Sequence, residues 1–317
     1  EKFRETRRSF PGAAKAGYGV LGQILVSVVI ICENIGRTMV AMITLWANVL
    51  FLFQYEILNK QQLEEKSMHA LSSWVVVGST LCILPFIVSY VYLSELHSGR
   101  LLMFASTSLL SILILLNFIT MGSIPFEHLR ILPDSLHDLA LAIGIFIANL
   151  AGHACLPSIH SQMRNKEEYD SAVNISWLII FGIQVITGVI GYVTFGDHTN
   201  FILTHSMIEY GGDFTLTIIL IVLLIMNLFF HIPIGVIISA ELPLNALQIT
   251  HPLIRRIFHV IWFFAIASFA YLLVSNVAVL SSVMGSIFTL TISMLCPVLF
   301  KMHLEHQEMS KSKHWVL

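Results

Sequence analysis

Long runs without a single charged residue constrain this chain more than any other feature. Five segments contain no Asp, Glu, Lys or Arg, namely 72–94, 101–126, 139–163, 171–196 and 214–240. A run of about 18 or more such residues is long enough to cross a bilayer as a helix. Because 56% of the residues are hydrophobic and 11% are charged, we expect an all-α polytopic membrane protein rather than a soluble domain.

Two further regions need interpretation. The uncharged run 257–300 is roughly twice the length of one span, so we divide it near Ser275 and Asn276 into two helices. The apolar region 16–55 is interrupted by Glu33 and Arg37, and it fits either one long tilted helix or two short ones. One long helix gives eight spans in total.

The distribution of cations decides between these alternatives, since cytosolic loops carry an excess of Lys and Arg. With one long helix, 13 of the 17 cations fall on one side, 3 fall on the other and Arg37 lies inside the span. Splitting the region moves the 5 N-terminal cations across and Arg37 into a turn, which leaves 9 against 8. We therefore predict one helix over 16–55, with both ends of the chain cytosolic.

The predicted organisation is a cytosolic segment 1–15, a transmembrane domain 16–302 and a cytosolic segment 303–317. The predicted spans are 16–55, 72–94, 101–123, 139–163, 171–196, 214–240, 257–274 and 277–300. Both ends look like cuts in a longer protein, because the chain begins without Met in a basic, loop-like stretch and stops where apolar residues resume.

The span 139–163 contains an interruption. Its first 12 residues reach about the bilayer midplane as a helix. Gly152 then lowers the cost of unwinding, and Pro157 suits the first turn of a new helix. A second half-helix would point free N–H groups and its positive dipole end at an anionic group, as in transporters with discontinuous helices. The alternative is a proline-kinked helix with a buried His153 that bonds to a neighbour.

Two pairs of polar residues lie inside predicted spans. Glu33 and Arg37 are spaced i,i+4, so they share a helix face and can neutralise each other, either as a structural pair or as a gate or proton relay. Asn227 and His231 have the same spacing and fit either a cavity wall or hydrogen bonds between helices. The small-residue run at 281–286 suits close helix packing or the lining of a pathway.

The sequence carries no enzyme signature. Its 14 histidines are scattered and form no spacing expected of a membrane metalloenzyme, so we expect no metal site and no cofactor. There is no glycine-rich phosphate loop, which argues against a pump driven by ATP, and no basic patch that would favour nucleic acid.

Three blocks together resemble a known family. They are SFPGAAKAGYGVLGQ at 9–23, GHACLPSIHSQMRNKEEYD at 152–170 and GVIGYVTFGD at 188–197. Their order and content are similar to the amino acid/auxin permease family, closest to its vacuolar and vesicular amino acid transporters, over nearly the whole chain. That family has eleven spans, the first ten of which form two inverted five-helix repeats. The resemblance implies that the eight spans here correspond to the third to tenth, and that the first, second and eleventh have no counterpart.

The resemblance implies secondary active transport of small amino acids, with proton coupling favoured and sodium not excluded. We expect substrate contact at Asn149, Ala151, Gly152 and His153, coupling or gating at Glu33 with Arg37, and a cavity lined by Asn227 and His231. An endomembrane, vacuolar, lysosomal or of a synaptic vesicle, is favoured over the plasma membrane. Two alternatives stay open: a truncated, non-transporting product that interacts with other membrane proteins, and a channel, although rings of like charge are absent.

Overall fold

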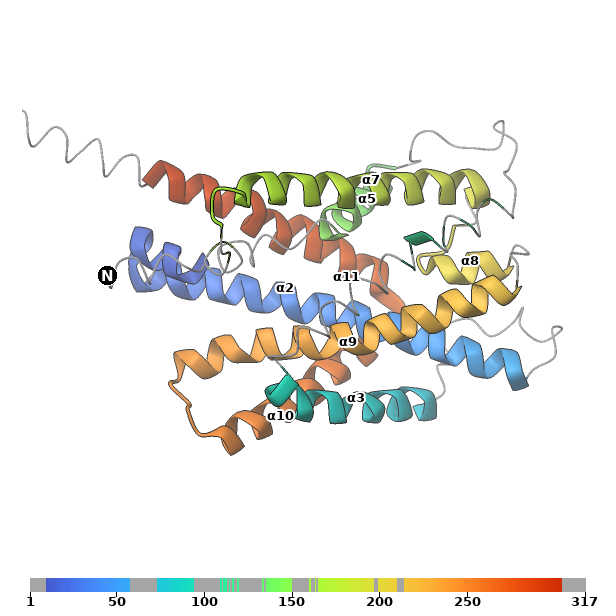
Figure 1. The fold of residues 1–317 in the computed structure, drawn as a ribbon, viewed down its shortest axis with the longest axis horizontal. Coiled ribbons are helices and arrows are strands. Elements are labelled where there is room, and N and C mark those ends of the chain that lie inside the picture. The colour runs from blue at the N-terminus through green and yellow to red at the C-terminus, as the bar shows by residue number, and fades with distance from the viewer. Residues whose placement is uncertain are drawn as a thin grey trace, which may run out of the picture.

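The computed structural model is an assembly of helices that run along one long axis (Figure 1). It describes residues 10–57, 73–93, 135–149, 165–196, 199–209 and 214–303, together with isolated positions between 109 and 163. Within these residues, five helical stretches are long and apolar enough to cross a membrane, and two shorter apolar helices accompany them. The expected fold class, an all-α polytopic membrane protein, is confirmed.

Within the described residues, eight α-helices follow one another along the chain. Their bounds are α2 (Phe10–Ile57), α3 (Ser73–Leu93), α5 (Leu136–Asn149), α7 (Tyr169–Phe195), α8 (Leu203–Glu209), α9 (Phe214–Ala246), α10 (Pro252–Leu272) and α11 (Val277–Val283). A 3₁₀ turn, η5 (Val274–Asn276), joins α10 to α11. After α11 the same helix continues to His303 through two π-helical segments, η6 (Met284–Thr289) and η7 (Thr291–Leu295).

Helix α2 contains the whole predicted range 16–55 and crosses the full length of the assembly (Figure 1). Gly19 interrupts its regular geometry with φ 70° and ψ −159°, a conformation that is open to glycine but strained for residues with a side chain. Several helices extend past their uncharged cores: α9 includes Glu241, and α10 includes Arg255 and Arg256. A helix can continue beyond the hydrocarbon, where water and partner charges satisfy such groups.

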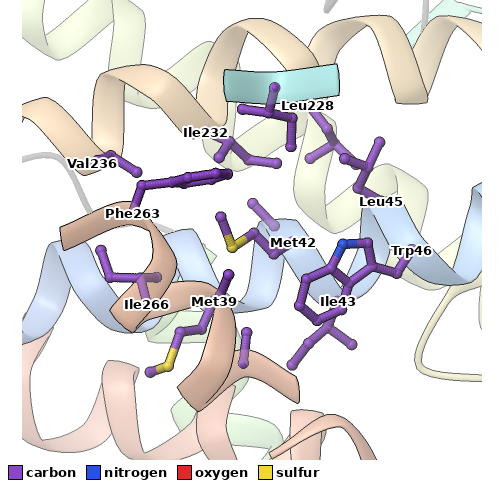
Figure 2. Close-up of a cluster of buried hydrophobic side chains, with 14 of the residues drawn as sticks. Met39, Met42, Ile43, Leu45, Trp46, Leu228, Ile232, Val236, Phe263 and Ile266 are labelled. Atoms are coloured by element: carbon purple, nitrogen blue, oxygen red, sulfur yellow. The ribbon is translucent and has the colours of Figure 1, made fainter. Parts of the chain in front are cut away.

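The main core lies where α2 packs against α9, with α10 and α3 beside them. Met42 and Trp46 of α2, Ile232 of α9 and Phe263 of α10 are fully buried there. Figure 2 shows the side chains of these three helices meeting in one cluster. Elsewhere large apolar side chains point outward, for example Leu178 of α7, which is 71% exposed. Such side chains suit contact with lipid, in which an apolar surface needs no cover.

A second close contact joins α5 to α11 and η6. Glycines make it possible: a methyl group on Gly144 would collide with Ser282, and one on Gly285 would collide with the carbonyl oxygen of Gly144. Small residues of this kind let membrane helices approach to backbone contact. The packing therefore holds the C-terminal half of α5 directly against η6.

Candidate functional site

Glu33 is a carboxylate buried in the middle of α2. It is 3% exposed, and Nη2 of Arg37 donates a hydrogen bond of 2.8 Å to its Oε1. The two residues are one helical turn apart, as their i,i+4 spacing predicts. An unpaired charge at this depth would be strongly unfavourable, and the guanidinium of Arg37 supplies an opposite charge beside the Glu33 carboxylate.

Thr289 provides a second hydrogen bond to the same carboxylate oxygen. Its Oγ1 donates to Glu33 Oε1 over 2.9 Å, and Thr289 itself is 1% exposed. Thr289 is the last residue of the π-helical segment η6. The residue lies 256 positions away in sequence, so helical spacing could not reveal the contact. The run 281–286 just before it was the available signal, because small residues at a helix interface often precede a buried polar contact.

Close packing of η6 on α2 fixes this geometry. A methyl group on Gly36 would collide with the side chain of Met284 in η6. Isolated π-turns in α-helices are frequent at functional sites. Here two π-helical segments follow each other, and the first ends on the residue that binds Glu33.

Arg37 faces α9 as well as Glu33. Its side chain is 28% exposed, and its Nε is buried without a hydrogen-bond partner among the described residues. His231 of α9 lies within electrostatic range of the guanidinium and is exposed. One turn further along α9, Gly235 meets Thr38 of α2 closely. The predicted pair Asn227 and His231 therefore lies on the α9 face that meets α2, and His231 sits at its edge.

The predicted substrate residues are only partly described. Asn149 ends α5; it is exposed, and its carbonyl oxygen accepts a hydrogen bond of 3.0 Å from Nε2 of Gln184 in α7. Ala151, Gly152 and His153 lie outside the described residues. The neighbouring Ala148 contacts η6, because a methyl group on Gly285 would collide with both Gly144 and Ala148. Gly285 is four residues before Thr289, so the end of α5 lies about one helical turn from the partner of Glu33.

A second polar cluster joins the end of α9 to the start of α10, the end of the assembly where α2 begins (Figure 1). Glu241 Oε2 pairs with Arg255 Nη2, and Glu241 Oε1 lies 3.3 Å from Nε2 of His259. Arg255 also donates to Asn245 Oδ1 over 3.3 Å and to the carbonyl of Ile249 over 2.9 Å. Sequence analysis missed this cluster, although Glu241 and Arg255 flank adjacent predicted spans on the same side of the membrane.

At the opposite end, the short helix α8 packs on α9 and bonds to α2. Thr204 Oγ1 donates to Asn48 Oδ1 over 2.8 Å, and both residues are buried. The ring of His205 lies 5.6 Å from that of Phe51. Burial lowers the pKa of His205 below its ordinary value of 6.5, and a hydrogen bond with the Ala47 backbone opposes this shift. Burial therefore favours the neutral imidazole at this contact.

In the part of the chain that the structure describes, no three His, Cys, Asp or Glu side chains gather where a metal ion could bind. What the site around Glu33 offers is a carboxylate that can change charge, an arginine with an unused donor and a hydroxyl from another helix.

Comparison with known proteins assigns a family. The family described as "Transmembrane amino acid transporter protein" matches residues 2–317. Among curated proteins, the amino acid transporter AVT1E of Arabidopsis thaliana is 24% identical over 193 residues, which is 60% of this chain and 35% of that protein. The matched region thus spans about a third of that relative's length. No solved structure matches significantly.

Proposed function

Because the chain belongs to the family of transmembrane amino acid transporter proteins, we propose that it transports small amino acids by secondary active transport coupled to protons. The family and the name of the Arabidopsis relative both support an amino acid as the substrate. Proton coupling is supported by Glu33, a titratable group held at a contact between two helices. Movement of a solute rather than chemical conversion is the role of the site.

The single observation that carries the proposal is the shared oxygen of Glu33. Arg37 and Thr289 both donate to Oε1, and Thr289 belongs to a helix packed closely on α2 at Gly36. Protonation would cancel the charge that both donors stabilise and weaken the bond between α2 and η6. Alternating access requires such a change, because a proton can drive transport only if it binds two states of the carrier differently.

The amino acid would bind beside this carboxylate. The resemblance places its contacts at Asn149, Ala151, Gly152 and His153, and the end of α5 packs about one turn from Thr289. A half-helix that begins after the interruption would direct free N–H groups at the substrate carboxylate. Asn227 and His231 would line the same space from α9, near the unused Nε donor of Arg37.

The cation distribution supports the proposed orientation, and the resemblance to vacuolar and vesicular transporters supports the proposed location. With both termini cytosolic, the Glu241 cluster faces the cytosol and α8 faces the lumen of an endomembrane compartment, vacuolar, lysosomal or vesicular. An acidic lumen would supply the protons. This assignment also makes α8 and His205 the part of the chain exposed to acid.

Uptake by proteoliposomes tests the proposal. The protein is reconstituted, and uptake of labelled small amino acids is measured under an imposed pH gradient and, separately, under a sodium gradient. We expect uptake with the pH gradient alone. Uptake driven only by the sodium gradient would show that sodium, not the proton, is the coupling ion. No uptake under either gradient would favour a truncated, non-transporting product, in line with a match to 35% of the relative.

A paired substitution tests the substrate residues. His153→Ala, compared with His160→Ala, should lower uptake while both variants keep the same thermal unfolding midpoint. His160 is an exposed histidine nearby, so it controls for loss of an imidazole as such. Equal uptake by the two variants would show that His153 packs in the protein without contacting substrate.

A further inference from the structure

The hydroxyl of Thr289 has a different kind of partner from the hydroxyls of three other threonines in the bundle. Thr38, Thr44 and Thr291 each donate to a carbonyl four residues earlier in their own helix. This is the usual choice of a threonine inside a membrane helix, where the carbonyl is always within reach. Thr289 donates instead to a carboxylate on another helix.

Thr289 lies at the end of a π-helical segment, η6. The carbonyl four residues before Thr289 belongs to Gly285, and it already accepts the backbone N–H of Leu290, five residues further on. The wider turn of a π-helix pairs each carbonyl with the residue five positions later. The turn alone does not redirect a hydroxyl, because Ser286 of η6 and Thr291 of η7 still donate to carbonyls four residues earlier. What distinguishes Thr289 is the carboxylate of Glu33, which the packing of α2 on η6 places within its reach.

We propose that Thr289 is a positioning residue for proton exchange at Glu33. Its hydroxyl holds Oε1 toward η6 and, together with Arg37, stabilises the ionised carboxylate. Thr289 thereby sets the pH at which Glu33 takes up a proton. The hydrogen bond from Thr289 to Glu33, which joins η6 to α2, weakens when Glu33 loses its charge. The coupling role of Glu33 belongs to the proposed function, but its protonation can be measured with or without transport.

Other ionisable groups around Glu33 come from each packed helix. Arg37 shares α2, and His231 approaches Arg37 from α9. The α5 sequence carries no ionisable residue after Asp138 in its first turn, and α10 directs Arg255 and His259 to Glu241. On the helix of Thr289, Cys296 is buried in a separate cluster with Ile30 and Ile292. Arg37 is thus the charged group in direct contact, and it is unchanged in the variants below.

The test is a pH titration of the purified, reconstituted protein followed by infrared difference spectroscopy. The carboxylic acid C=O band reports protonation, and its loss in Glu33→Gln identifies the band. Thr289→Val keeps the shape of threonine and removes its donor, so the midpoint should rise by about one pH unit, because a charge-stabilising hydrogen bond is lost. Thr289→Ser restores the donor and should return the midpoint close to wild type.

The control is Thr291→Val, which removes a hydroxyl that bonds within η7 and should leave the midpoint unchanged. Thr289→Cys has a weak donor and should give an intermediate midpoint. It replaces Thr289→Val in the comparison if the valine variant does not fold. Equal midpoints for wild type and the folded Thr289 variants would overturn the proposal, as would a wild type without a Glu33 band. A Thr289-dependent midpoint in a protein without gradient-driven uptake would support this inference and refute the proposed function.

Discussion

Two buried or half-buried carboxylates, Glu33 and Glu241, show how the same pair of charges can serve different purposes. Each pairs with an arginine, but Arg37 lies on the same helix as Glu33, whereas Arg255 lies on α10 and Glu241 on α9. The bond from Glu33 to another helix goes to the neutral hydroxyl of Thr289. A change of charge at Glu33 therefore breaks no ion pair between helices, while a change at Glu241 does.

Solvent access sharpens this difference. Glu33 is 3% exposed, whereas the side chains of Glu241 and Arg255 are 30% and 25% exposed. Water screens the second pair, so its contribution to stability is small, but it ties the ends of α9 and α10 together. We propose that Glu241 has a structural role, and that Glu33 is the carboxylate that changes charge during transport.

Glu33→Gln should have the largest effect. The amide keeps the size of the side chain but cannot take up or release a proton, so uptake driven by a pH gradient should fall at least about a hundredfold, about 2.7 kcal/mol of lost driving interaction. Exposed Glu167 provides the matched control, since Glu167→Gln removes a carboxylate outside the bundle. If Glu33→Gln keeps its uptake, Glu33 has no role in coupling and its ion pair with Arg37 is structural.

Gly285→Ala should come next, through packing rather than charge. The added methyl group would meet the Gly144 carbonyl, so α5 and η6 must separate, at a cost of about 2 kcal/mol. We expect a lower yield of folded protein and a displaced Thr289, visible as a changed pH midpoint of uptake. Gly182→Ala in α7 is the control, because nothing lies within 4 Å of its added methyl group. Equal yields would show that α5 does not support the Glu33 site.

Part of this architecture was open to prediction from sequence. The uncharged runs indicated the fold class, because hydrocarbon leaves a helix as the simplest way to satisfy the backbone. The Glu33–Arg37 pair followed from its i,i+4 spacing. Thr289 did not, because its contact depends on how η6 packs against α2, which brings it to a residue 256 positions away. The contact between Glu241 and Arg255 was not predicted, because the predicted spans stop at 240 and begin at 257, whereas α9 and α10 continue past these limits and meet.

Glu241→Gln should affect stability and leave coupling intact. Loss of the charge leaves Arg255 with its bonds to Asn245 and Ile249 and removes the partner of buried His259. Since both partners are about a quarter or more exposed, we expect only about 1 kcal/mol, or roughly 2–4 °C in the thermal unfolding midpoint.

A double-mutant comparison checks that the effect belongs to the pair. Glu241→Gln with Arg255→Gln should be little worse than the more harmful single variant, because the two side chains share one interaction. The pH dependence of uptake should match that of wild type in all three. A shifted pH dependence would mean that Glu241 takes part in proton transfer and that the contrast with Glu33 is wrong.

The smallest effect is expected at α8, on the other end of the bundle. Because the pKa of His205 is lowered on folding, its neutral form stabilises the docked helix fully above the ordinary value of 6.5. As pH falls below that value, the unfolded form binds the proton more readily, so this stability is lost progressively until the lowered folded pKa is reached.

His205→Phe tests this expectation, because it keeps a ring beside Phe51 and should remove the pH dependence of α8 stability. Hydrogen exchange of α8 measured at about pH 7.5 and about pH 5 should therefore speed up in acid for wild type and for the exposed control His251→Phe, but not for His205→Phe. Acid-accelerated exchange that persists in His205→Phe would place the responsible group elsewhere and separate α8 from any response to an acidic lumen.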